Sequence, residues 1–145
     1  GGGMGGGGGG FFTRARCGPG GLPGAGGREP VATAGIGVRG WAAAPDAGDV
    51  GTPRPGTINI IVSLPVPLTD AALVNAIATA TEAKVQALVE LGADASGTPT
   101  DAVCVACPAA GAPAEPFAGP RSLWGARLAR AVHRATREAC TGLPR

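Results

Sequence analysis

The 145-residue chain has only one histidine, no long apolar run and a small net charge, and each of these features argues against a class of function. Its only histidine, His133, falls on the polar side of a predicted helix with no fixed partner, which argues against a Ser-His-Asp triad. No stretch approaches the roughly 18 apolar residues of a membrane span, and no signal-peptide core is visible, so we expect a cytoplasmic protein with no membrane span. A net charge of +2 is too small to indicate a nucleic-acid partner, and we expect none.

Cysteine is also sparse, at four residues, which is not the density of a disulfide-stapled secreted domain. We expect free thiols. Cys104 and Cys107 form a CxxC, but 101–107 has the composition of a buried strand, on which positions three apart face opposite sides. A second CxxC is missing. We therefore expect no metal site and no cofactor.

Glycine is abundant, at 27 residues, and much of it lies before residue 29. Residues 1–28 show almost no apolar periodicity and are expected to be a disordered tail, although Phe11 and Phe12 could anchor it locally. Residues 29–142 are expected to form a single domain. A GxGxxG at 35–40 could indicate dinucleotide binding, but that needs a helix immediately afterwards, and Pro45 interrupts the segment that follows. A turn is the better interpretation.

The remaining pattern predicts strand, helix, strand, helix. Residues 57–64 alternate as a half-buried strand, and Thr69 is a suitable N-cap for a helix over 70–91 that ends at Gly92. A second strand at 101–107 would lie parallel to the first, and 31–36 would add a third. The final helix carries an apolar face of Trp124, Leu128, Ala131, Val132, Ala135 and Ala139. We predict a single α/β domain with a small mixed sheet flanked by helices.

Lys84 is the most unusual residue of the 70–91 helix. It falls within the predicted apolar stripe, which consists of Leu73, Ile77, Ala80, Leu88 and Leu91, opposite a polar stripe of Asn75, Thr79, Glu82, Gln86 and Glu90. Its ammonium should either snorkel to water or reach a carboxylate or ligand. Glu82 lies about 160° away on the helix and cannot share a site with it, so Glu82 is a solvated ion-pair residue or a general base elsewhere.

Two further candidates depend on Lys84 or on the next strand. Thr81 lies three residues before Lys84, so the two could meet on one helix face as a nucleophile and its activator. Asp101, preceded by Thr98 and Thr100, could activate water; the alternative is an ordinary polar turn with side-chain to backbone hydrogen bonds.

Four ordered segments resemble the adenosylcobinamide amidohydrolase family: Gly56-Thr57-Ile58-Asn59, Thr79-Ala80-Thr81-Glu82-Ala83-Lys84, Gly97-Thr98-Pro99-Thr100-Asp101, and the run from Trp124 to Val132. The resemblance extends from about Val31 to Ala139. It implies an enzyme that hydrolyses the aminopropanol amide of a corrinoid, adenosylcobinamide, to give adenosylcobyric acid.

In the predicted arrangement, the start of the 57–64 strand, the middle of the 70–91 helix and the loop before Asp101 could converge on one polar pocket. Asn59 would orient or polarise the amide carbonyl there, Lys84 would hold developing negative charge or a substrate acceptor group, and Asp101 or Glu82 would manage the proton. The expected catalytic residues are then Lys84, Asp101, Glu82 and Thr81, and the expected substrate-binding residues are Thr57, Asn59, Thr98 and Thr100.

The chain departs from the family pattern in two places. Family members usually carry a longer structured segment before the part equivalent to Val31, and Pro99 replaces a glycine of the loop before Asp101. A proline removes an N–H donor from any backbone cradle there. The alternative function is therefore a catalytically inactive corrinoid-binding or vestigial protein of the same fold.

Overall fold

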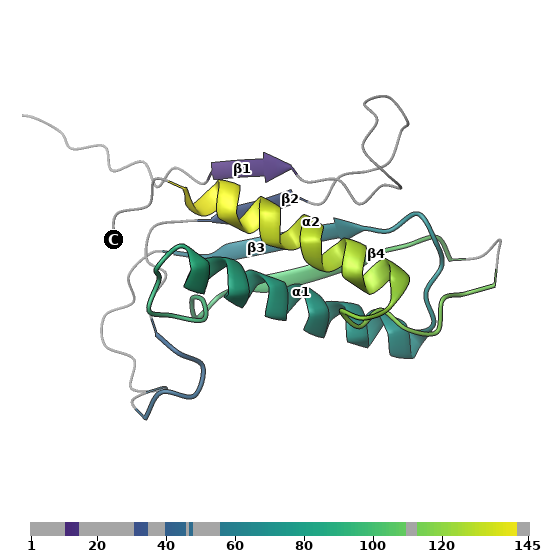
Figure 1. The fold of residues 1–145 in the computed structure, drawn as a ribbon, viewed down its shortest axis with the longest axis horizontal. Coiled ribbons are helices and arrows are strands. Elements are labelled where there is room, and N and C mark those ends of the chain that lie inside the picture. Colours follow the sequence, from purple (N-terminus) through teal and green to yellow (C-terminus); the bar gives the residue numbers. More distant parts are fainter. Residues whose placement is uncertain are drawn as a thin grey trace, which may run out of the picture.

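The computed structural model describes residues 11–14, 31–34, 40–45, 47, 56–109 and 113–141. Within these described residues, four strands and two helices follow one another (Figure 1). Their bounds are β1 Phe11–Arg14, β2 Val31–Ala34, β3 Ile58–Ser63, α1 Asp70–Glu90, β4 Ala102–Ala106 and α2 Leu123–Cys140.

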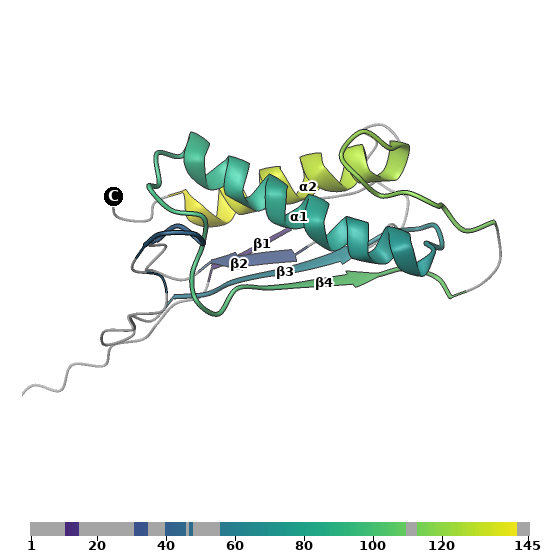
Figure 2. The same ribbon diagram turned by 90° about the horizontal axis from the view of Figure 1, so that it is seen from below.

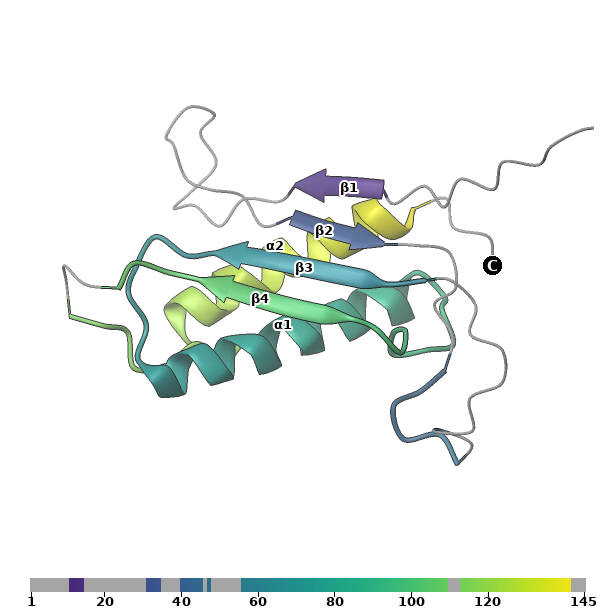
Figure 3. The same ribbon diagram turned by 180° about the vertical axis from the view of Figure 1, so that it is seen from behind.

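The strands form one mixed sheet in the order β1-β2-β3-β4. β1 and β2 are antiparallel, as are β2 and β3, whereas β3 and β4 are parallel, with Ile60 opposite Val103. Both helices lie on the same face of the sheet (Figure 2), and the other face is open to view in Figure 3, with β1 and β4 at the edges. The predicted α/β class, the mixed sheet with its flanking helices and the parallel neighbours are confirmed, and the structure adds that both helices lie on one face.

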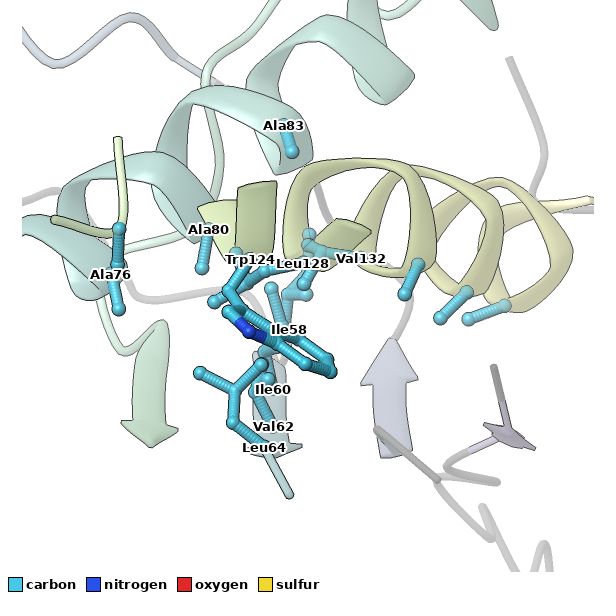
Figure 4. Packing of buried hydrophobic residues seen from close by; sticks show 14 of the residues in the cluster. Ile58, Ile60, Val62, Leu64, Ala76, Ala80, Ala83, Trp124, Leu128 and Val132 are labelled. Atoms are coloured by element: carbon cyan, nitrogen blue, oxygen red, sulfur yellow. The ribbon is translucent and has the colours of Figure 1, made fainter. Parts of the chain in front are cut away.

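The core lies between the helices and β3 (Figure 4). The predicted alternation of β3 is confirmed, because Ile58, Ile60 and Val62 are buried whereas Asn59 and Ile61 are exposed. The prediction of a buried strand at 101–107 is wrong. β4 is an edge strand whose residues alternate between exposed and half-buried, since nothing among the described residues covers its outer face.

α1 begins as predicted, because the Thr69 hydroxyl accepts a hydrogen bond from the Ala72 N–H. Its buried face differs from the predicted stripe. Ile77 is 44% exposed and Thr79 is buried, and the residues turned toward α2 and β3 are mostly small. They are Ala72, Ala76, Thr79, Ala80, Ala83, Lys84, Ala87 and Leu88. Alanines let the two helix backbones approach closely, so volume is supplied from α2 and β3 instead (Figure 4).

α2 buries its whole predicted apolar face, and the Ser122 hydroxyl caps it at the Gly125 N–H. The loop before it is fixed to α1. The Ala118 N–H donates to the Asn75 side chain at 3.2 Å, and the Thr79 hydroxyl donates to the Ala118 carbonyl at 2.8 Å. A Cβ at Gly125 would overlap the Ala118 and Gly119 carbonyls, so this helix start requires glycine.

Some predictions fall largely outside the described residues. Of residues 1–28 the structure describes only β1, so the boundary at residue 29 stays a prediction. The GxGxxG is described only at Gly40, and the described residues that follow it, 41–45 and 47, form turns and no helix. In the described part of the chain, neither helix has the length and apolar character needed to span a membrane.

Candidate functional site

The site lies at the end of the sheet where β3 and β4 begin. Lys84, on the last half of α1, reaches Asp101, the residue before β4, with Nζ 2.5 Å from Oδ2. The two side chains are only 8% and 12% exposed. Of the alternatives left open for Lys84, contact with a carboxylate is the one that the structure shows, and the snorkelling alternative is wrong.

Asp101 accepts four hydrogen bonds. Oδ2 accepts from Lys84 and from the Thr98 N–H at 3.1 Å, and Oδ1 accepts from the Ile58 N–H at 2.9 Å and the Thr98 hydroxyl at 2.5 Å. Burial by itself would raise the pKa of Asp101, but these bonds outweigh it and hold the pKa below the ordinary 3.8. The carboxylate is therefore ionised at neutral pH and has all its acceptor positions in use.

Gly97 makes this arrangement possible. A Cβ at this position would overlap Asp101 Oδ2 and lie 2.5 Å from Lys84 Nζ. The backbone of the Gly97–Asp101 loop can therefore lie directly against the ion pair only because residue 97 has no side chain.

Two more of the predicted residues join the same loop. The Thr57 and Thr100 hydroxyls hydrogen-bond to each other, and the Thr100 hydroxyl also donates to the Gly56 carbonyl at 3.2 Å. This ties the start of β3 to the turn before β4. The segment thus has the side-chain to backbone hydrogen bonds of the polar-turn alternative, with Pro99 at an exposed position within it.

Three predicted residues lie apart from the Lys84–Asp101 pair. Asn59 is on the sheet face opposite the helices, because alternation along β3 sends Ile58 and Ile60 toward them. Glu82 is exposed on α1, as its helix position requires. The Thr81 hydroxyl is exposed and donates to the Ile77 carbonyl at 3.0 Å, so it does not meet Lys84.

Cys140, the last residue of α2, also lies near Asp101 and was not among the predicted site residues. Its thiol is buried, and burial together with the nearby negative charge of Asp101 raises its pKa to about 11. It is therefore a thiol and not a thiolate nucleophile at neutral pH. The described cysteines, Cys104, Cys107 and Cys140, are free, as expected. Spacing offers no signal for Cys140 or for the Ile58 N–H, because tertiary packing alone brings them to the site.

This arrangement can stabilise negative charge. Lys84 uses one of its three N–H protons on Asp101, and among the described residues no other group accepts from it. The other two N–H protons of Lys84 are therefore available to donate to a carbonyl oxygen or an oxyanion. In the same described residues, no three His, Cys, Asp or Glu side chains come close enough together to hold a metal ion.

Comparison with known proteins gives consistent matches. A model of the adenosylcobinamide amidohydrolase family matches residues 28–142. An adenosylcobinamide amidohydrolase of Methanosarcina mazei is 42% identical over 87 residues, which cover 54% of this chain and 44% of the relative. One of Halobacterium salinarum is 40% identical over 96 residues, covering 64% of this chain and 41% of the relative. No solved structure matches the chain.

The chain thus spans less than half the length of these two relatives. The family match, however, extends over most of the chain and includes both helices, β3, β4 and the whole Lys84–Asp101 site. On that match, the chain belongs to the adenosylcobinamide amidohydrolase family.

Proposed function

We propose that this protein hydrolyses the amide that joins the aminopropanol arm of adenosylcobinamide to the corrin ring. Water adds to the amide carbonyl, the C–N bond breaks, and adenosylcobyric acid and free aminopropanol leave. The observation that carries the proposal is the buried Lys84 ammonium. It is held by Asp101, and two of its N–H protons remain available as hydrogen-bond donors. The names of the two relatives support the choice of substrate.

Lys84 would stabilise the oxyanion that forms when water attacks the carbonyl. A cation acts most strongly where water is excluded, and this side chain is only 8% exposed. The ammonium is also held in place before the substrate arrives, so no reorganisation is needed during the reaction.

Asp101 would position Lys84 instead of accepting a proton. Its pKa is lowered and its acceptor positions are taken by Lys84, Thr98 and Ile58, so it is a weak base. Its hydrogen bonds connect α1, the start of β3 and the loop before β4. The amide substrate would then meet one oriented cation at the point where these three elements converge.

The test is incubation of the purified chain with adenosylcobinamide and detection of adenosylcobyric acid by mass spectrometry. Lys84→Gln keeps a hydrogen-bond donor for Asp101 but removes the charge, and should lower the rate by roughly 10²-fold or more. Val74→Ala is the control, because Val74 is 71% exposed on the same helix. Its rate should stay within about twofold of the wild-type rate, as expected for a surface substitution.

Each outcome has a definite meaning. Product formation that depends on Lys84 supports the proposal. Corrinoid binding without product would instead favour the alternative, a binding protein of the same fold. A folded sample that gives neither product nor binding would exclude both.

A further inference from the structure

A second feature at this end of the molecule is the segment around Trp41. Figure 1 shows residues 40–45 beyond the end of the sheet where β3 and β4 begin, and Figure 3 shows the same from behind. Gly40 pairs with Ala95 in an isolated parallel bridge, and Ala95 lies two residues before Gly97, which packs against Lys84 and Asp101.

Three hydrogen bonds fix this segment to the loop after α1. The Ser96 N–H donates to the Gly40 carbonyl at 3.0 Å, and the Ala42 N–H donates to the Ser96 hydroxyl at 2.9 Å. The indole N–H of Trp41 donates to Asp94 Oδ1 at 2.8 Å. The backbone on both sides of Trp41 and the ring itself are therefore held in place.

The indole is nevertheless 44% exposed. Its only polar atom is already hydrogen-bonded to Asp94, so what it presents to solvent is apolar ring surface. The other tryptophan of the chain, Trp124, is buried in the core. A rigid, exposed aromatic ring next to a site loses little conformational entropy on binding and offers a stacking surface.

We infer that Trp41 is a substrate-binding residue that stacks against a flat π-system of the corrinoid. This rests on the proposed function. The flat surface could be the corrin ring or the adenine of the adenosyl ligand, since both offer a π-face. Asp94 is the positioning residue that sets the angle of the indole, and Trp41 takes no part in the chemical step.

The test measures dissociation constants of the full chain by equilibrium dialysis, with adenosylcobinamide and with dicyanocobinamide, which lacks the adenosyl group. Trp41→Ala should weaken binding of adenosylcobinamide by roughly tenfold, the scale of losing one stacking partner. Trp41→Phe keeps an aromatic face and should stay within about threefold. If Trp41 stacks on the corrin ring, Trp41→Ala should weaken the binding of both ligands. If it stacks on adenine, Trp41→Ala should weaken the binding of adenosylcobinamide alone.

Controls separate stacking from loss of structure. Asp94→Ala frees the indole and should weaken binding, whereas Asp94→Asn keeps an acceptor and should not. Phe117→Ala removes a 69% exposed aromatic at the opposite end of the helices, near the start of α2, and should leave binding unchanged. In turnover assays the effect of Trp41→Ala should appear in KM with kcat retained.

Two results would overturn the inference. One is Trp41→Ala binding both corrinoids within twofold of the wild type. The other is Trp41→Phe losing as much as Trp41→Ala, which would assign the effect to the Asp94 hydrogen bond alone. Binding is measured without turnover, so the test of Trp41 does not depend on catalysis. A wild-type protein that binds adenosylcobinamide but yields no product would count against the proposed hydrolysis alone.

Discussion

At the residue scale, two buried threonines with opposite hydrogen-bonding states make a matched pair. The Thr79 hydroxyl lies 2.8 Å from the Ala118 carbonyl, whereas the Thr136 hydroxyl is buried on α2 with no hydrogen-bond partner among the residues that the structure describes. Thr79→Val strands a buried carbonyl and should lower the free energy of unfolding by about 1–3 kcal/mol. Thr136→Val removes only an unsatisfied group and should be neutral or stabilising. Urea unfolding of both variants checks this, and equal losses would contradict it.

Asp101 gives a pH prediction at the same scale. Its pKa is lower in the folded state than the ordinary 3.8, so its contribution to stability is complete above that value and is lost as pH falls through the folded-state pKa. The stability difference between wild type and Asp101→Asn should thus be largest near neutral pH and shrink below about pH 4. Urea midpoints between pH 7 and pH 3 measure it. A difference that grows toward acid would contradict the assigned hydrogen bonds.

At the element scale, the approach of α2 to the loop before it sets a strict size limit. A Cβ at Gly125 would overlap backbone carbonyls of Ala118 and Gly119, whereas a Cβ at Gly119 would meet only the Asn75 side chain, at 3.0 Å. Gly125→Ala should therefore cost about 2 kcal/mol or more, since backbone must move. Gly119→Ala should cost less, because a small shift of the Asn75 side chain relieves the contact and can keep its hydrogen bond to the Ala118 N–H. Thermal midpoints of the two variants measure this. A lower midpoint for Gly119→Ala than for Gly125→Ala would contradict the prediction.

The elements also show what sequence patterns could and could not predict. β3, the Thr69 cap and the apolar face of α2 were predictable because each has strong local periodicity or capping chemistry. The buried face of α1 was not. Its alanines carry too weak an apolar signal against Val74, Ile77 and Val89, which are exposed, and its orientation is decided by the close approach of α2.

The candidate site also has a part that was predictable from the sequence and a part that was not. A lysine on a buried helix face must find a partner, so the need for a carboxylate followed from Lys84 itself. That the partner is Asp101, and that Thr98 and the Ile58 N–H complete its hydrogen bonds, depends on three elements meeting at the end of the sheet. Asn59 was misplaced among these residues because its strand position faces away from both helices.

At the scale of the whole molecule, the sheet with helices on one face gives its cysteines very different access to solvent. Cys104 is exposed on the open face, whereas Cys140 is buried at the end of α2 with a pKa of about 11. At pH 8 only about one Cys140 thiol in a thousand is ionised, and burial blocks reagents as well. In a Cys17→Ser background, a thiol reagent should therefore label Cys104 at once and Cys140 only through unfolding.

The decisive measurement is the labelling rate of Cys140 against urea concentration, followed by mass spectrometry of the peptide that contains it. If α1, α2 and β3 unfold as one unit, the free energy of opening at Cys140 should equal the global free energy of unfolding, and both should fall by the same amount in Gly125→Ala. That variant alters the opposite end of α2 from Cys140. Two outcomes would contradict this: Cys140 is labelled as fast as Cys104 in the native protein, or its labelling rate does not change in Gly125→Ala. Either would mean that the C-terminal end of α2 opens independently of the core.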